Sequence, residues 1–93
     1  MKVKMGLIEK AKFCRDLAVL GKANEVELAT LQLLQSDTSI FSFAKIPISE
    51  WATGTLIMLG KLKYEENKTE NMDYVLQTYK DFRELYKNGT LEL

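Results

Sequence analysis

The sequence predicts an all-α fold, a compact bundle or orthogonal array of four main helices, with a short fifth helix as an option. Apolar residues recur every three to four positions along most of the chain, which is the period of an amphipathic helix. The chain has only one proline and five glycines, and both residue types usually mark turns and loops. Because 93 residues are enough for one domain, residues 1–93 are expected to form a single helical domain.

Two helices are expected in the first third of the chain, at residues 4–20 and 25–35. One arc of the first helix carries only apolar or small side chains, those of Val3, Leu7, Ala11, Cys14, Leu17 and Ala18. Gly21 is a typical helix stop. Asn24 is a favourable N-cap for the second helix, because its side-chain oxygen can accept a hydrogen bond from a backbone N–H of the first turn.

The chain between these helices and Ser49 has the most ambiguous pattern. Residues 36–39 favour a turn, because their side chains compete for backbone hydrogen bonds. Residues 39–45 are predicted to form a short helix, since the segments around them are helical. An extended stretch is the alternative, because Phe41 and Phe43 alternate with small residues. Pro47 disfavours helix at the residue before it and ends this segment.

The third and fourth main helices are expected at residues 50–66 and 72–87. Ser49 is the predicted cap of the third helix. The fourth helix has the clearest pattern, with a narrow apolar face made by Met72, Val75, Leu76, Tyr79, Phe82 and Tyr86. Asn88 and Gly89 form a strong stop, so residues 88–93 are expected to be a frayed tail.

The sequence lacks the groups that most catalytic and metal sites use. It has no histidine, the usual acid–base group near neutral pH and a common metal ligand. The single cysteine, Cys14, falls on the apolar arc of the first helix and is expected to be a buried structural residue. No Gly-rich phosphate loop is present, and the acidic residues at positions 65–73 lie in a polar stretch expected to be solvated. We therefore expect no enzymatic activity, no metal and no cofactor.

One face of the first helix is basic, although the net charge of the chain is zero. On a continuous helix, Lys4, Arg15 and Lys22 align within roughly 20°, and Lys12 lies nearby. Such a stripe could contact phosphates or an acidic protein, while a solvated lysine face is the simpler alternative. A nucleic-acid-binding regulator is therefore the second hypothesis. The segments that would read DNA bases count against it, because they carry few Arg, Lys, Asn or Gln residues.

Several apolar residues lie off the main stripes of the predicted helices. They are Leu28, Leu31, Ile57, Tyr64, Tyr74 and Leu85. Small residues near Ile57, among them Gly54 and Gly60, would let another helix approach closely. Either these residues are covered by the segment containing Phe41 and Phe43, or they form a surface that binds a partner.

The leading hypothesis is a small non-enzymatic protein–protein interaction domain: a regulator, inhibitor or adaptor. It would act by packing apolar helix faces, rimmed by charge, against itself or another protein. Charges interrupt the N-terminus before any apolar run, so no signal peptide is predicted. The uncharged stretch Trp51–Gly60 is about half the roughly 20 residues that a membrane span needs. We expect a cytoplasmic protein with no membrane segment.

Overall fold

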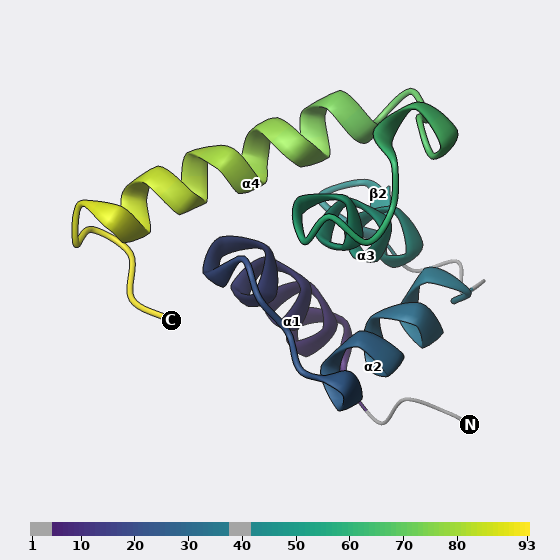
Figure 1. The fold of residues 1–93 in the computed structure, drawn as a ribbon, viewed down its shortest axis with the longest axis horizontal. Helices are drawn as coiled ribbons and strands as arrows, with labels where there is room; N and C mark the ends of the chain where they lie inside the picture. The colour runs from purple at the N-terminus through teal and green to yellow at the C-terminus, as the bar shows by residue number, and fades with distance from the viewer. Residues whose placement is uncertain (1–4, 38–41) are drawn as a thin grey trace.

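Helices account for most of the residues that the computed structural model describes, which are 5–37 and 42–93 (Figure 1). The α-helices are α1 (Leu7–Leu20), α2 (Glu25–Gln35), α3 (Ile48–Met58) and α4 (Met72–Lys87). A two-stranded antiparallel hairpin, β1 (Ser42–Phe43) and β2 (Ile46–Pro47), precedes α3, and a 3-10 turn, η1 (Tyr64–Glu66), precedes α4. The prediction of four packed helices is confirmed, and the all-α description is corrected by the small sheet.

The helices with the clearest end signals have the predicted bounds. α2 begins with a reciprocal capping arrangement, in which Asn24 Oδ1 accepts from the Glu27 N–H at 2.8 Å and Glu27 Oε1 accepts from the Asn24 N–H at 2.9 Å. α1 ends at Leu20, and Gly21 follows it with a left-handed φ of 74°, which suits glycine. α1 begins at Leu7 rather than at residue 4. Lys4 lies outside the described residues.

The predicted short helix at residues 39–45 is wrong over 42–45, because this part of the chain forms β1 and the hairpin turn. Residues 39–41 lie outside the described part. Ser42 pairs with Pro47 and Phe43 with Ile46. The extended alternative prevails because it buries Ile46 and lets the Trp51 indole N–H donate to the Phe43 carbonyl at 3.0 Å. Tertiary contacts therefore override the helical surroundings.

The third helix is shorter than predicted and begins earlier. It runs from Ile48, directly after Pro47, to Met58, rather than from 50 to 66. The helix stops because Gly60 adopts a left-handed φ of 75° and its N–H donates to the Ile57 carbonyl, which is a typical helix-ending geometry. Only the short 3-10 turn η1 remains of the predicted continuation.

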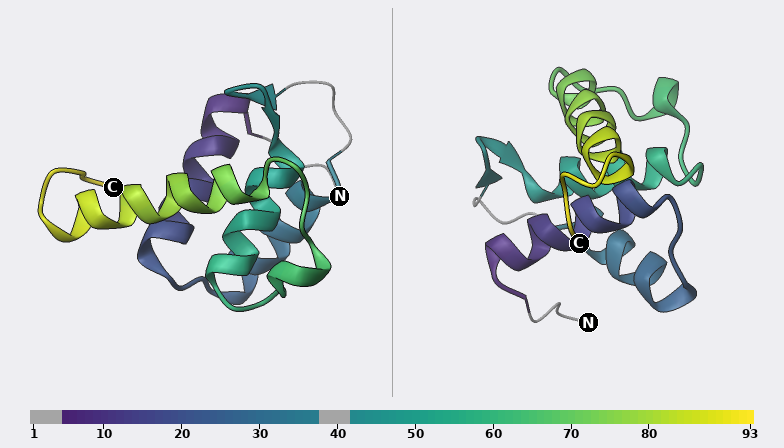
Figure 2. Two further views of the ribbon diagram at one scale, coloured as in Figure 1. Left: turned by 90° about the horizontal axis from the view of Figure 1, so that it is seen from above. Right: turned by 90° about the vertical axis from the view of Figure 1, so that its left-hand side faces the viewer.

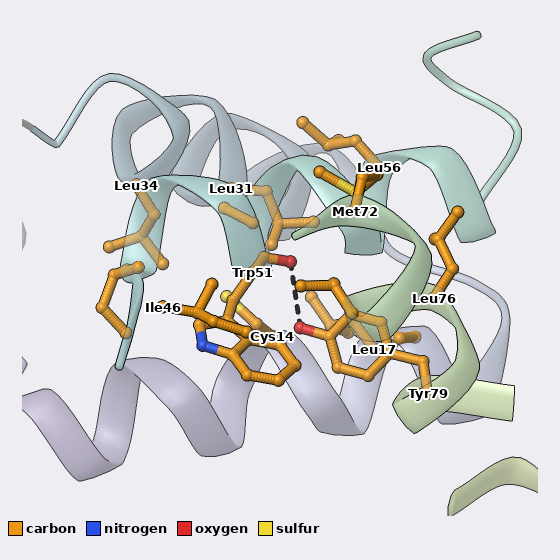
Figure 3. Packing of buried hydrophobic residues seen from close by; sticks show 14 residues of the cluster. Cys14, Leu17, Leu31, Leu34, Ile46, Trp51, Leu56, Met72, Leu76 and Tyr79 are labelled. Atoms are coloured by element: carbon orange, nitrogen blue, oxygen red, sulfur yellow. Dashed lines mark hydrogen bonds between the residues drawn. The ribbon is translucent and has the colours of Figure 1, made fainter. Parts of the chain in front are cut away.

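α3 is the central helix, and it packs against α1, α2 and α4. Figure 2 shows α4 crossing the other helices, with its C-terminal end extending past the body of the molecule. The main buried side chains are Cys14, Leu17, Leu31, Leu34, Trp51, Leu56, Met72, Val75 and Tyr79. Figure 3 shows the labelled side chains of this core converging from all four helices.

A small polar network joins three helices inside this core. The Thr55 hydroxyl lies 2.8 Å from the Cys14 carbonyl and 3.2 Å from the Tyr79 hydroxyl. Tyr79 in turn donates to the Trp51 carbonyl at 2.9 Å (Figure 3). No buried side-chain nitrogen or oxygen among the described residues lacks a hydrogen-bond partner. The network satisfies the hydroxyls and fixes α1, α3 and α4 relative to one another.

The end of the chain beyond α4 is partly ordered by hydrogen bonds. The N–H groups of Thr90 and Leu91 donate to the Leu85 carbonyl at 2.8 and 3.1 Å. The start of the segment predicted to be a frayed tail is therefore hydrogen-bonded to α4. Within the described ranges, none of the helices has the length and hydropathy needed to cross a membrane.

The close approach predicted at the small residues of the third helix is made by α4 of the same chain. A methyl group at Gly54 would overlap Val75 Cγ1 and press against the Tyr79 ring. Gly54 is therefore a packing residue between α3 and α4.

Replacing Gly54 with alanine is expected to lower the free energy of unfolding by about 1–2 kcal/mol. Overpacking costs about 1–3 kcal/mol, and the better helix propensity of alanine returns up to about 1 kcal/mol. Chemical denaturation would measure the difference. Gly6→Ala serves as a comparison, because a methyl group there meets only the Glu9 carboxylate at 3.5 Å. Its own cost comes from the N-cap position of Gly6 in α1, where alanine is less favourable than glycine. A Gly54→Ala variant as stable as the wild type would contradict the packing role.

Candidate functional site

A groove among the described residues lies between α1, the hairpin and α4. Its volume is about 370 Å³, within the range of small binding sites. Trp51 of α3 and Tyr79 of α4 form its base, and both side chains are almost completely buried. Their rings meet edge to face with centroids 5.5 Å apart. The base is therefore rigid and aromatic.

Three exposed apolar side chains surround this groove. Ile8 of α1 is 74% exposed, Tyr74 of α4 is 59% exposed, and Phe43 of β1 is 41% exposed. Each comes from a different element, so the rim exists only in the folded chain. Phe43 also contacts Trp51 edge to face, with centroids 6.4 Å apart. Phe43 therefore joins the exposed rim to the buried aromatic base, and all of these residues line one groove.

Two cations of α1, Lys12 and Arg15, are the charged side chains that line the groove. Arg15 is held from two sides. Its Nε and Nη2 donate to Asp16 Oδ1 at 3.1 and 2.9 Å, and its guanidinium lies 5.6 Å from the Phe82 ring centroid. Lys12 Nζ donates to Asp16 Oδ2 at 3.2 Å. One carboxylate thus positions both cations.

The hairpin turn beside the groove is made by residues that do not favour its backbone conformation. Its central residues, Ala44 and Lys45, have φ values of 54° and 66°, a left-handed conformation that glycine or asparagine usually provides in such turns. Each non-glycine residue in this conformation costs about 1–3 kcal/mol. Ala44 lines the groove. Backbone strain of this kind concentrates at functional sites.

Cys14 is a buried neutral thiol next to the base of the groove. Burial raises its pKa to about 12, and a hydrogen bond with Thr55 opposes that rise. Burial also raises the pKa of Tyr79 well above its usual value. Both groups therefore stay protonated at neutral pH. The prediction that Cys14 is a buried core residue is confirmed.

The six predicted apolar contact residues differ in burial and do not lie on one surface. Leu31 is fully buried and belongs to the core, so it cannot contact a partner. Leu28, Ile57 and Tyr64 are partly buried against the core. Only Tyr74 reaches the groove, and Leu85 is exposed farther along α4. Four of the six residues are thus used within the chain, because α3 lies at the centre of the fold.

The predicted basic stripe is also divided. Lys12 and Arg15 line the groove, whereas Lys22 lies beyond the end of α1 at a separate shallow hollow. Lys4 lies outside the described residues. Asp16 balances part of the charge of Lys12 and Arg15. The described residues therefore provide no continuous basic face along α1.

Most of the residues that line the groove were not predicted as site residues, among them Ile8, Phe43, Ala44 and Phe82. A signal existed for Ile8, because it is an apolar residue within the basic stripe of the first helix. Phe43 and Ala44 reach the groove through the hairpin, which depends on tertiary contacts. Phe82 was predicted as part of the apolar face of the fourth helix, and it lies half-buried between Tyr79 and the exposed Tyr86 on that face.

No group of acidic or cysteine side chains suited to holding a metal ion is found in residues 5–37 and 42–93. No protein-family model matches the chain, and no curated protein or solved structure shows significant similarity to it.

Proposed function

We propose that this chain is a non-enzymatic protein–protein interaction domain, acting as a small regulator, inhibitor or adaptor. Its groove would receive a large apolar side chain from a segment of another protein. The observation that carries the proposal is the ring of exposed apolar side chains, Ile8, Phe43 and Tyr74, around one aromatic hollow. Isolated exposed apolar residues are common on monomers, whereas continuous apolar patches usually mark contact surfaces.

The exposed rim favours a polypeptide over a small molecule. A ligand small enough to fill the groove would leave much of the Ile8 and Tyr74 side chains in water. A polypeptide segment would fill the groove and cover the rim as well, which removes more apolar surface from water. Aromatic side chains such as those of the rim and base are enriched at protein interfaces.

The charges around the groove favour a different protein over a second copy or a nucleic acid. In a two-fold dimer formed through this groove, both copies would bring the same patch to the contact. The groove of the second copy would then offer Lys12 and Arg15 no acidic lining residue, because its charged lining residues are the same two cations. Nucleic acid, the second hypothesis, needs a run of cations along phosphates. Here two cations share Asp16 and the rim beside them is apolar.

Selection from a library of random displayed peptides tests the proposal. Wild-type protein should enrich peptides that contain large apolar side chains, and Tyr74→Ala should weaken their binding at least tenfold, the size of effect expected at a central contact. The matched control is Tyr86→Ala, which removes another exposed tyrosine from the same helix outside the groove.

The control variant should change peptide affinity by less than about twofold, because surface substitutions away from a site have small effects. Circular dichroism would verify that both variants are folded. Failure to enrich any apolar peptide, or equal effects of the two substitutions, would contradict the proposed function.

A further inference from the structure

We infer that the segment bound in the groove carries a carboxylate beside its apolar side chain, and that Lys12 and Arg15 bind this carboxylate. The inference rests on the proposed function of the groove. Lys12 and Arg15 are its charged lining residues, and both are cations. An acidic side chain entering beside an apolar one would meet both.

Arg15 is held in place before any partner arrives. Its guanidinium lies over the Phe82 ring and donates through Nε and Nη2 to Asp16. A guanidinium has five N–H donors, more than these two bonds use. Because the side chain is already ordered, binding a carboxylate costs little further conformational entropy. A planar guanidinium also matches the geometry of a carboxylate.

Lys12 supplies a second cation on the same side of the groove. Its ammonium contacts the other oxygen of Asp16 at 3.2 Å, and its side chain is mostly exposed. Lys12, Arg15 and Asp16 together carry a net charge of +1. This charge balances one carboxylate, whereas a phosphoryl group carries about −1.5 to −2 at neutral pH. The geometry therefore favours an aspartate or glutamate over a phosphorylated residue.

Synthetic peptides test the inference directly. The peptide most enriched on the wild-type protein would be compared with a copy in which its acidic residue is replaced by the matching amide. The acidic peptide should bind about tenfold more tightly, as expected for a charge-assisted hydrogen bond. Because the pair is charged and partly exposed, this advantage should shrink as salt concentration rises.

Two charge-reversal variants of the protein test whether Lys12 accounts for the preference for the acidic peptide. Lys12→Glu should weaken binding of the acidic peptide about tenfold and reduce its advantage over the amide peptide. Lys12 is exposed enough for this variant to fold. Lys22→Glu is the matched control, since Lys22 belongs to the same predicted basic stripe but lies outside the groove. Lys22→Glu should change the affinity for the acidic peptide and for the amide peptide by no more than about twofold.

The outcomes separate this inference from the function on which it rests. Enrichment of apolar peptides without an acidic preference, or equal affinity for the acidic and amide peptides, would overturn the inference and leave the groove as a binding site. Equal effects of Lys12→Glu and Lys22→Glu would also overturn it, because general charge would then explain the preference. If Tyr74→Ala has no effect on peptide binding, the proposed function fails and the inference fails with it.

Discussion

Replacing Trp51 with alanine is expected to lower the free energy of unfolding by about 3–5 kcal/mol, the usual cost of deleting a large buried ring. Trp51 is 5% exposed and contacts both Phe43 and Tyr79 edge to face. Its indole N–H also holds β1 through the Phe43 carbonyl. Domains have only about 0.05–0.15 kcal/mol of stability per residue, so this loss is a large fraction of the total for 93 residues.

Urea denaturation followed by circular dichroism would measure this loss. Trp51→Phe is the informative companion, because it keeps an aromatic ring and removes the N–H that binds the Phe43 carbonyl. Trp51→Phe should lower the free energy of unfolding by less than Trp51→Ala does. About 1 kcal/mol of its effect should come from the lost hydrogen bond. A Trp51→Ala variant destabilised by less than about 1 kcal/mol would show that Trp51 does not anchor the core and the hairpin.

The parts of the fold that could be predicted are those determined by local signals. α2 and α4 have the predicted bounds because caps, stops and apolar period agree there. The Asn24 cap is present in the structure, and α4 ends immediately before the predicted stop. These signals depend on residues within one or two helical turns, so no knowledge of the tertiary structure was needed.

The errors arose where distant contacts decide the local conformation. Residues 42–47 form a hairpin because Trp51 binds the Phe43 carbonyl and Ile46 enters the core. The apolar period continues to Leu62 and predicts a third helix that passes through Gly60, yet Gly60 adopts a left-handed conformation and ends the helix. An isolated glycine in a helical pattern can either continue the helix or end it, and the flanking residues do not show which of the two occurs.

The candidate site was predicted only in part, and under two separate hypotheses. Tyr74 belonged to the apolar set, while Lys12 and Arg15 belonged to the basic stripe. The structure brings these three residues to one groove. The hairpin completes that groove with Phe43. Because an extended stretch was only the alternative for this segment and no hairpin was predicted, the sequence could not show that the two sets share one surface.

Replacing Ile8 with glutamate is expected to weaken binding of a groove-selected peptide by at least about 30-fold, as at an interaction hot spot. The substitution places a carboxylate on the apolar rim, where a bound segment would exclude water and leave the charge poorly solvated. It also repels the acidic residue inferred for the partner. Ile8 is 74% exposed in the free protein, so the fold itself should tolerate the change.

Fluorescence titration of Trp51 is the most direct test of the proposed groove. Trp51 is the only tryptophan in the chain and lines the groove, so its emission reports occupancy by a tryptophan-free peptide. The matched control for Ile8→Glu is Val26→Glu, since Val26 is 76% exposed on α2, outside the groove. We predict a saturable change with similar Kd in wild type and Val26→Glu, and a Kd at least about 30-fold higher in Ile8→Glu. The same Kd in all three proteins would contradict binding at the groove.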